Sequence, residues 1–389
     1  MAILSVDVGN GYVKAFAVTE SGDGYKIREN ERGELNESLS FETIAIPDER
    51  KFRFNPDKRT LPGTYEICLD NKYWLIGEMA YMHKGRRNWG TGRQHVVSDS
   101  YLYCVTAAMD MFEEPSNGIL DITLLLGVPY SVYHDYFKEN GEYDSDLAKS
   151  LLGKSFHVAH GEREMIVKFS DVRIYAQGCG AYYSNILSTD GRGKSKEAVE
   201  MIDSVMIDVG YKTTDVVVYT LNKRLRAFET MEEYCFSMDA GMRNVIEKIP
   251  EFLFDHTGVD FTLEEIDEGV INGTNSVRLG REMISFEEPL KEKSEVLAND
   301  IYEELRRREE KVIKTWPYIF ISGGGSTHVY PYLKKKIPLL EIIPGDATFA
   351  NARGYVSWYK LEETVAKRRA AAAKAKAEKK AETESKDSE

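Results

Sequence analysis

The chain contains only four cysteines, and they do not form a recognisable set. Cys68, Cys104, Cys179 and Cys235 stand far apart, with no C-x-x-C spacing. Zinc centres and redox pairs usually show that spacing, and disulfide frameworks use closely spaced even sets. We therefore expect none of these sites, and free thiols in a reducing cytoplasm.

Long hydrophobic runs are also lacking. No apolar segment reaches the roughly 18–20 residues that a membrane helix needs. The N-terminus passes directly into the strand-like run Ile3–Val6, without the basic and apolar regions of a secretory signal. We expect a cytoplasmic protein with no membrane partner.

Basic charge is in deficit. Lys and Arg total 51 against 64 Asp and Glu, which gives a formal net charge of −13 at pH 7. Binding to DNA phosphates needs a basic surface. We therefore expect no direct nucleic acid binding, so that any link to DNA passes through a partner protein. At 389 residues, 42% of them hydrophobic, the chain is long enough for two domains of ordinary size.

Two common catalytic patterns are missing as well. The segments Gly153–Ser155 and Gly193–Ser195 resemble the end of a Walker loop, but Ala148 and Ser188 stand where its first glycine is required. The seven histidines form no H-E-x-x-H pair. The sequence therefore predicts neither a P-loop nor a zinc hydrolase.

One short pattern occurs twice, about half the chain length apart. Near the start it reads Val6-Asp7-Val8-Gly9-Asn10-Gly11-Tyr12-Val13-Lys14, and in the middle Ile207-Asp208-Val209-Gly210-Tyr211-Lys212-Thr213-Thr214-Asp215. In each copy an apolar run ends at an aspartate, a glycine follows two residues later, and a second strand begins. The pattern predicts two β-hairpins with tight turns.

Tight turns of this kind can bind phosphate. Backbone N–H groups that point outward from a turn form an anion-binding nest. The aspartate at the end of the strand supplies the hard oxygen ligand that a hydrated Mg²⁺ prefers. Either copy alone is typical of an ordinary hairpin, but two copies facing one another would hold one nucleotide from both sides.

A third element supports this interpretation. Residues 316–326 read Trp-Pro-Tyr-Ile-Phe-Ile-Ser-Gly-Gly-Gly-Ser, which is a buried-type strand that ends in Gly323, Gly324 and Gly325. Without Cβ atoms, the backbone of such a run can lie flat against a ligand.

Strand and helix patterns alternate along the chain and predict an α/β protein. The expected strands beyond the hairpins are 65–69, 73–76, 119–128, two within 154–174, and 340–343. The expected helices are 98–112, 133–151, most of 243–310, and one that begins near Ala350. The duplicated hairpin predicts two similar domains around a cleft.

Composition marks two segments that stand outside these domains. Residues 29–62 are polar and read as an exposed insertion. From about residue 362 the chain consists mainly of Lys, Ala and Glu and has almost no side chains that could form a core. This tail is expected to be a solvated, largely disordered extension, partly helical through its alanines. We expect it either to keep the protein soluble or to act as a basic contact for an acidic partner.

The motifs together resemble those of actin and its bacterial relatives. Asp7-x-Gly9-x-Gly11-x-x-Lys14 looks like the first phosphate motif, Asp208-x-Gly210-x-x-Thr213-Thr214-Asp215 like the second, and Ser322-Gly323-Gly324-Gly325 like the adenosine motif. Gln177 before a small-residue helix resembles the first connecting helix, and Phe349-Ala350-Asn351-Ala352-Arg353-Gly354-Tyr355 the second. All five stand in the order of the family. The chain is thus similar to the actin-like ATPase superfamily, and within it to plasmid-segregation actins of the ParM type.

The resemblance implies a fold of two similar actin-like, ribonuclease-H-like domains around a nucleotide cleft. Domain I would comprise residues 1–175 and 345–361, and domain II residues 176–344, with residues 362–389 as the low-complexity tail. The ligand would be Mg-ATP, with GTP as the alternative.

The resemblance also assigns roles to residues. Asn10, Gly11 and Tyr12, with Gly210, Tyr211, Lys212 and Thr213, would hold the β- and γ-phosphates. Lys14 would stabilise charge during cleavage, Asp7 and Asp208 would hold Mg²⁺, and Gln177 would orient the attacking water. An amide does not take up a proton at neutral pH, so hydrolysis should be slow. The base and ribose would lie on Gly323, Gly324 and Gly325 and near Gly241 and Asn244.

The function implied is that of an ATPase that polymerises into dynamic filaments and segregates plasmid DNA through an adaptor protein. Its partners would be further copies of itself and that adaptor. Two alternatives share the frame: a sugar or small-metabolite kinase, and another cytoskeletal bacterial actin. A kinase needs an acidic base in the cleft, whereas Gln177 occupies the corresponding helix. A DnaK-type chaperone is disfavoured, because only the tail follows the ATPase frame.

Overall fold

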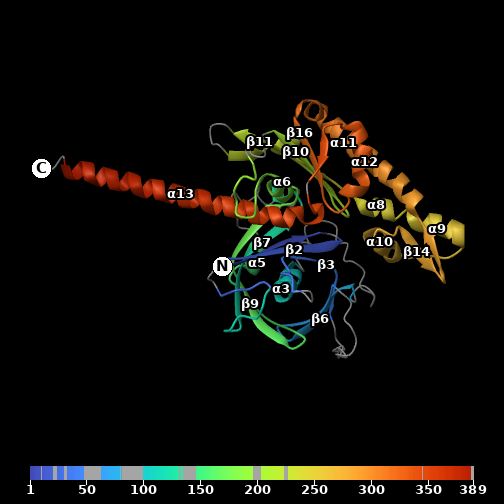
Figure 1. Ribbon diagram of the computed structural model, residues 1–389, viewed down its shortest axis with the longest axis horizontal. Coiled ribbons are helices and arrows are strands. Elements are labelled where there is room, and N and C mark those ends of the chain that lie inside the picture. The colour runs from blue at the N-terminus through green and yellow to red at the C-terminus, as the bar shows by residue number, and fades with distance from the viewer. Residues whose placement is uncertain are drawn as a thin grey trace.

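Two β-sheets, each covered by helices, form the body of the protein, and one long helix extends away from it (Figure 1). The computed structural model describes residues 1–9, 11–20, 24–29, 33–47, 63–78, 80, 100–130, 133–134, 146–195, 203–222, 227–343 and 345–386. The expected α/β class with two domains agrees with this architecture.

The first sheet has nine strands in the order β3-β2-β1-β7-β9-β8-β5-β6-β4. Its central strands β1 and β7 are almost continuously apolar because both faces of the sheet are covered. The strands are β1 (Ala2–Val8), β2 (Tyr12–Thr19), β3 (Ser38–Glu42), β4 (Ala45–Pro47), β5 (Thr64–Leu69), β6 (Lys72–Gly77), β7 (Ile119–Val128), β8 (Ser155–His160) and β9 (Arg163–Ala176).

The second sheet has the order β12-β11-β10-β16-β17, with β13 also paired to β11. Its strands are β10 (Ser204–Val209), β11 (Thr214–Asn222), β12 (Ala227–Thr230), β13 (Phe236–Met238), β16 (Tyr318–Ser322) and β17 (Leu340–Ile342). A separate two-stranded hairpin consists of β14 (Ser276–Leu279) and β15 (Glu282–Ser285).

The two sheets share one topology. In the first, β1 pairs antiparallel with β2 and parallel with β7, and β7 pairs parallel with β9. In the second, β10 pairs antiparallel with β11 and parallel with β16, and β16 pairs parallel with β17. The duplicated sequence pattern therefore lies at equivalent turns, β1–β2 and β10–β11.

The helices agree with most of the sequence predictions. They are α3 (Ser100–Met111), α5 (Asp146–Leu151), α6 (Cys179–Ile186), α8 (Met242–Ile246), α9 (Ile249–Thr257), α10 (Leu263–Ile271), α11 (Glu287–Thr315), α12 (Ser326–Lys336) and α13 (Ala350–Lys386), with short 3₁₀ turns η1 (Glu232–Tyr234) and η2 (Ala347–Phe349). The prediction that residues 243–310 are mostly helical missed the β14–β15 hairpin, which turns at Gly280. Val277 is the one residue of its two strands that is fully buried. Of the helix expected over 133–151, residues 135–145 lie outside the described ranges.

Helices α6 and α13 cross between the two sheets. Tyr355 and Val356 of α13 pack in a core with Ile3 and Leu125 of the first sheet. Tyr182 of α6 stacks on Tyr219 of the second sheet, with ring centroids 4.0 Å apart. The two helices therefore join the two halves of the protein.

The crossing point requires glycine on both helices. A Cβ atom on Gly354 would lie 1.6 Å from the carbonyl oxygen of Gly180, and one on Gly180 would lie 2.5 Å from that of Asn351. No side chain fits between the two backbones, so α6 and α13 are in direct backbone contact.

The tail is the second half of α13. Residues 366–375 are all exposed, so the predicted solvation is confirmed. The helix extends farther through the tail than the sequence indicated, because the alanines and lysines of this segment are strong helix formers. Of the insertion expected over 29–62, the structure describes residue 29 and residues 33–47, which include β3 and β4.

Candidate functional site

The first turn of the site joins β1 to β2. The backbone N–H of Gly9 donates to the carbonyl oxygen of Tyr12 (3.1 Å), which closes the turn. A Cβ atom on Gly9 would lie 2.8 Å from that oxygen, so the close approach requires glycine. Thr43, just after β3, donates through Oγ1 to the carbonyl oxygen of Gly9 (2.7 Å) and through its backbone N–H to that of Gly11 (3.1 Å). Hydrogen bonds from outside the hairpin therefore also hold this turn.

The second turn repeats this geometry between β10 and β11. The backbone N–H of Gly210 donates to the carbonyl oxygen of Thr213 (2.8 Å), and a Cβ atom on Gly210 would lie 2.9 Å from that oxygen. The first residues of α8 support the turn, because the backbone N–H groups of Met242 and Arg243 donate to the carbonyl oxygens of Gly210 (3.1 Å) and Tyr211 (2.7 Å).

The glycine run after β16 lies against the second turn. Gly323 has φ +88°, and a Cβ atom there would be 2.4 Å from the carbonyl oxygen of Val209 and 2.5 Å from Oδ1 of Asp208. Gly325 donates its backbone N–H to that carbonyl of Val209 (3.0 Å). Gly324 differs, because a Cβ atom there would meet no protein atom within 4 Å. The run is thus packed at both ends and open in the middle.

Two buried aspartates stand at the ends of the equivalent strands β1 and β10. Asp7 is 3% exposed and Asp208 is 7% exposed. Gln177, between β9 and α6, donates from Nε2 to Oδ1 of Asp7 (2.6 Å). Asn351, in the first turn of α13, donates from Nδ2 to Oδ2 of Asp208 (2.7 Å). Each carboxylate is therefore fixed by a side-chain amide that stands next to, or on, one of the crossing helices.

Further hydrogen bonds fix the amide of Asn351 and the carboxylate of Asp208. Oδ1 of Asn351 accepts from the backbone N–H groups of Gly178 and Ala181, both at 3.0 Å, at the start of α6. Ser322, the last residue of β16, donates from Oγ to Oδ1 of Asp208 (3.0 Å). Asn351 thus links α13, α6 and the end of β10 through one side chain.

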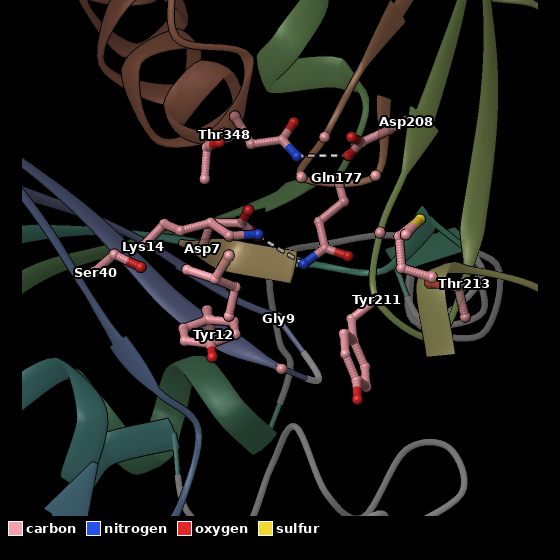
Figure 2. Close-up of a pocket in the computed structure, with 18 of the residues that line it drawn as sticks. Asp7, Gly9, Tyr12, Lys14, Ser40, Gln177, Asp208, Tyr211, Thr213 and Thr348 are labelled. Carbon is pink, nitrogen blue, oxygen red and sulfur yellow. Dashed lines mark hydrogen bonds between the residues drawn. The ribbon is translucent and has the colours of Figure 1, made fainter. Parts of the chain in front are cut away.

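These groups face one cavity of about 490 Å³ between the two sheets. In Figure 2, Gln177 lies between Asp7 and Asp208, and the rings of Tyr12 and Tyr211 lie on opposite sides. Cavities of 300–1,000 Å³ are typical of small-molecule sites. The sequence-predicted site residues on its wall are Asp7, Gly11, Tyr12, Lys14, Gln177, Asp208, Gly210, Tyr211, Thr213, Gly323, Gly324 and Gly325.

The other predicted residues lie elsewhere. Lys212 is in the second turn but is not on the cavity wall. Gly241 lies beneath that turn, where a Cβ atom would be 2.6 Å from the carbonyl oxygen of Tyr211. Asn244 accepts the backbone N–H of Gly241 at Oδ1 (2.9 Å) and so caps α8. Asn10 lies outside the described residues.

The cavity wall also contains residues that sequence reasoning did not assign to the site. Asn351 and Asp215 stood inside recognised motifs, so a signal for them existed, although neither was given a role. Asp267, on α10, carried no signal because its helix reads as an ordinary amphipathic one. The further additions to the wall are Gly9, Ser40, Met242, Ile246, Val270, Ile271, Thr327, His328 and Thr348.

The electrostatics of the cavity favour bound positive charge. Burial raises the pKa of Asp7, Lys14 lowers it, and the charge of Asp208 raises it again. Burial, with Asp208 and Asp7 as like charges, raises the pKa of Asp215 to about 7, although a hydrogen bond from Ser237 lowers it. The carboxylates of Asp7, Asp208 and Asp215 therefore repel one another in the cavity, and Lys14 offsets this repulsion only in part.

The residues present fit a hydrated divalent cation and a phosphate chain. Asp7 and Asp208 supply carboxylate oxygens, the ligand type that Mg²⁺ prefers, and Lys14 supplies a positive charge beside the first turn. Two glycine turns with equivalent geometry stand on the two sides. At the open backbone of Gly324 there is room for a ligand against the main chain.

Comparisons with known families agree with this geometry. Residues 5–180 match the model described as the N-terminal domain of actin-like proteins. Residues 206–335 match the one described as the C-terminal part of the archaeal actin homologue MreB-like. The two matches follow one another along the chain, with residues 181–205 between them. The chain belongs to the actin-like proteins. Among curated proteins, none matches it at a significant level.

Solved structures show the same two-domain fold. A 15-stranded ParM filament from Clostridium botulinum has a TM-score of 0.69 and 18% identity, covering 92% of this chain and 98% of that one. A non-polymerisable quadruple mutant of pCBH ParM has a TM-score of 0.67 and 18% identity, with 92% and 99% covered. An archaeal actin homologue in complex with ADP has a TM-score of 0.66 and 20% identity, with 92% and 99% covered. The actin-like fold is thus shared over nearly the full length.

Proposed function

We propose that this actin-like protein is a nucleoside triphosphatase that binds Mg-ATP in the cavity and assembles into filaments. The observation that carries the proposal is the equivalence of the two turns. Gly9 and Gly210 make the same backbone hydrogen bond to the third residue after them. Each turn follows a buried aspartate that lines one shared cavity. A ligand with a chain of phosphates would contact both turns at once.

The protein groups have distinct tasks in this proposal. The turns at Gly11, Tyr12 and Gly210–Thr213, with Asn10, hold the β- and γ-phosphates, and Lys14 places positive charge against them. Asp7 and Asp208 hold Mg²⁺, largely through its waters, and the ion supplies charge neutralisation for phosphoryl transfer.

Gln177 orients the attacking water. Its side chain lines the cavity and already donates to Asp7. Since an amide cannot remove the proton, its contribution is alignment, and turnover is expected to be slow.

The nucleoside is assigned to the end of the cavity near α8 and α10. Met242, Ile246, Val270 and Ile271 give this end an apolar wall, and the glycine run Gly323–Gly325 offers bare backbone. Burial lowers the pKa of His328 there, which favours the neutral form of the ring. An apolar slot beside open backbone suits a purine ring, and either ATP or GTP meets that requirement.

The nucleotide would control assembly by bridging the two halves. Domain I, residues 1–175 with 345–361, provides one turn, and domain II, residues 176–344, provides the other. A triphosphate that touches both favours the closed cleft only by its greater affinity for that state. Loss of the γ-phosphate weakens the bridge and, with it, the contacts between subunits. Similarity to ParM filaments supports self-assembly as the outcome of closure.

Segregation of plasmid DNA through an adaptor is the cellular role that we propose. The net charge of −13 disfavours direct DNA binding by the body, which supports a separate DNA-binding partner. Where the structure describes helices, none is both long and apolar enough to cross a membrane. We propose that the protein acts in the cytoplasm.

One observation favours a second candidate, a small-metabolite kinase. Such an enzyme needs an acidic base in the cleft with a pKa near the operating pH. Asp215 lines the cavity and has a pKa of about 7. The ATPase is preferred because Asp215 is already held by Ser237, on β13, rather than pointing alone into the space.

The test combines assembly and turnover in one sample. Light scattering and sedimentation are followed after ATP and Mg²⁺ are added, with phosphate release measured in parallel and GTP run as the alternative. We expect scattering and pelleting to rise first and phosphate to follow slowly, without any acceptor substrate. Asp208→Ala should abolish Mg²⁺-dependent release. Asp203→Ala, the same change at an exposed residue just before β10, should leave it unchanged.

The alternatives predict different results. Absence of assembly with either nucleotide, together with phosphate release only when a sugar or similar acceptor is added, would assign the kinase function. Unchanged phosphate release by Asp208→Ala would remove the metal role given to that carboxylate.

A further inference from the structure

The exposed part of α13 is a basic helix on an acidic protein. Residues 364–375 contain Lys367, Arg368, Arg369 and Lys374 and no acidic residue. The last ten of these residues are exposed. Lys367 pairs with Glu363 at 3.9 Å, but neither Arg368 nor Arg369 has an ion-pair partner within the described part of the chain. Two guanidinium groups of this helix are therefore unpaired with any carboxylate among the residues that the structure describes.

Figure 1 shows where this helix points. It leaves the body beside α6 and extends away from α9, α10 and β14, which lie at the opposite end of the long axis. An α-helix rises about 1.5 Å per residue, so the segment from residue 366 to 386 spans roughly 30 Å. The helix cannot reach the far end of its own body, although it can reach another molecule.

The opposite end of the molecule carries the complementary charge. Residues 249–275 contain seven acidic side chains and no Lys or Arg. We call the exposed acidic residues of this segment the acidic lobe; they are Glu251, Asp255, Asp260, Glu265 and Glu268. Phe254, Val259 and Ile271 in the same segment are 47%, 40% and 55% exposed. This segment therefore exposes apolar side chains as well as carboxylates.

We propose that the basic segment of α13, residues 364–375, docks on the acidic lobe of a second copy of this chain. The two surfaces lie at opposite ends of one molecule, so the contact is head-to-tail. A contact of this kind leaves one free surface at each end and adds subunits without limit unless a ring closes. This inference rests on the proposed function, because it names one of the contacts through which the filament would assemble.

A second copy fits the helix better than DNA does. Phosphates of a duplex would attract Arg368 and Arg369, but the helix is tied to a body whose overall charge is negative and repels DNA. A second copy is also negative overall, but its acidic lobe attracts the same arginines at one defined surface. It also offers exposed apolar surface, against which the alkyl stems of arginines can pack.

The contact should depend strongly on salt. Individual exposed ion pairs contribute little and are screened at physiological ionic strength. Several pairs along one helix would add up, so the contact is strongest at low salt. It would therefore adjust the stability of the filament and not provide all of it.

The test uses charge reversal on the full chain. One variant carries Arg368→Glu and Arg369→Glu, and a second carries Asp255→Lys and Glu268→Lys near the C-terminal ends of α9 and α10. A matched control carries Lys335→Glu and Lys336→Glu on α12, which changes net charge as much as the first variant. Circular dichroism and nucleotide binding are measured for each, so that misfolding is recognised.

Sedimentation at low and high salt, with and without ATP and Mg²⁺, gives the concentration needed for association. We expect each reversal to raise the concentration needed for association about tenfold at low salt. The control should leave this concentration near the parent value. The variant with both reversals should bring it most of the way back to the parent value. Recovery in the combined variant is the result that only a direct contact explains.

Three outcomes would overturn the contact. If the parent assembles with ATP and the Arg368 and Arg369 reversal changes nothing, α13 makes no such contact, although the filament function stands. If the parent stays monomeric in every condition, the contact and the filament function fail together. If the reversal leaves assembly intact but abolishes binding to a fluorescently labelled DNA duplex, the helix binds nucleic acid.

Discussion

Asn351 donates from Nδ2 to Oδ2 of Asp208 across 2.7 Å, and so ties the first turn of α13 to the end of β10. The same side chain accepts two backbone N–H groups at the start of α6 through Oδ1. A candidate metal ligand is thus positioned by the two helices that join the halves of the protein. A substitution of Asn351 is therefore expected to disturb the position of the Asp208 carboxylate.

Asn351→Asp is expected to keep the hydrogen bonds to α6 and to lose the one to Asp208. The variant keeps an oxygen for the α6 N–H groups but places a second carboxylate against Asp208, so two like charges meet in a buried site. We expect a loss of about 1–3 kcal/mol in the free energy of unfolding at pH 7, the usual cost of a buried polar group without its partner. Urea unfolding without Mg²⁺ measures it. Stability should recover in acid, and a variant as stable as the parent at pH 7 would contradict this account.

Gln177→Ala is expected to slow hydrolysis without blocking nucleotide binding. The side chain lines the cavity beside Asp7, and misplacing a reactant by about 1 Å can cost roughly 100-fold in rate. Single-turnover phosphate release should fall by about 10–100-fold, while scattering after addition of ATP persists longer than in the parent. Turnover at the parent rate would make Gln177 structural only. Gln177→Glu tests whether a carboxylate can serve in its place.

Gly323 and Gly324 form a matched pair of substitutions. At Gly323, φ is +88° and a Cβ atom would be 2.4 Å from backbone, so Gly323→Ala should destabilise the fold by about 1–3 kcal/mol. At Gly324 a Cβ atom would meet no protein atom, so Gly324→Ala should unfold like the parent yet bind nucleotide more weakly. Thermal unfolding and titration with a fluorescent ATP analogue distinguish them. Equal nucleotide affinity for Gly324→Ala and the parent would place the ligand elsewhere.

Asp215 should make the protein without nucleotide and metal less stable as pH rises. The folded chain binds the proton of this carboxyl more tightly than the unfolded chain does, because its pKa is raised from 3.8 to about 7. Stability is therefore expected to fall between about pH 4 and 7, by at most about 1.4 kcal/mol per pH unit for this one proton. Urea unfolding across this range should show a shallower slope for Asp215→Asn. Some slope should remain from Asp7, whose pKa is also raised.

The two hairpins and the glycine-ending strand could be predicted because their signals are local. An apolar run, an aspartate and a glycine two residues later are enough to specify a strand and the turn after it. The equivalent hydrogen bonds of Gly9 and Gly210 follow from that spacing. The order of the motifs then indicated the fold, since collinear short motifs are far more specific than any one of them.

The side-chain partners could not be predicted, because they join distant parts of the chain. Asn351 and Asp208 are 143 residues apart, and Gln177 and Asp7 are 170 apart. Nothing in either local sequence states which amide meets which carboxylate. The β14–β15 hairpin was missed for a different reason: its strands are short and mostly exposed, so their alternation is weak within a region of helical periodicity.

The contact between Gly180 and Gly354 has a mechanical consequence. Where backbone touches backbone there is no layer of side chains to compress or rearrange, so the two helices can turn about that point but hardly slide. Relative motion of the halves is then a rotation whose displacement grows with distance from the crossing. Near Asn351 and the aspartates it is small, and at α10 and β6 it is large. A pair of fluorescent labels at those outer elements would therefore report opening while the carboxylates stay almost in place.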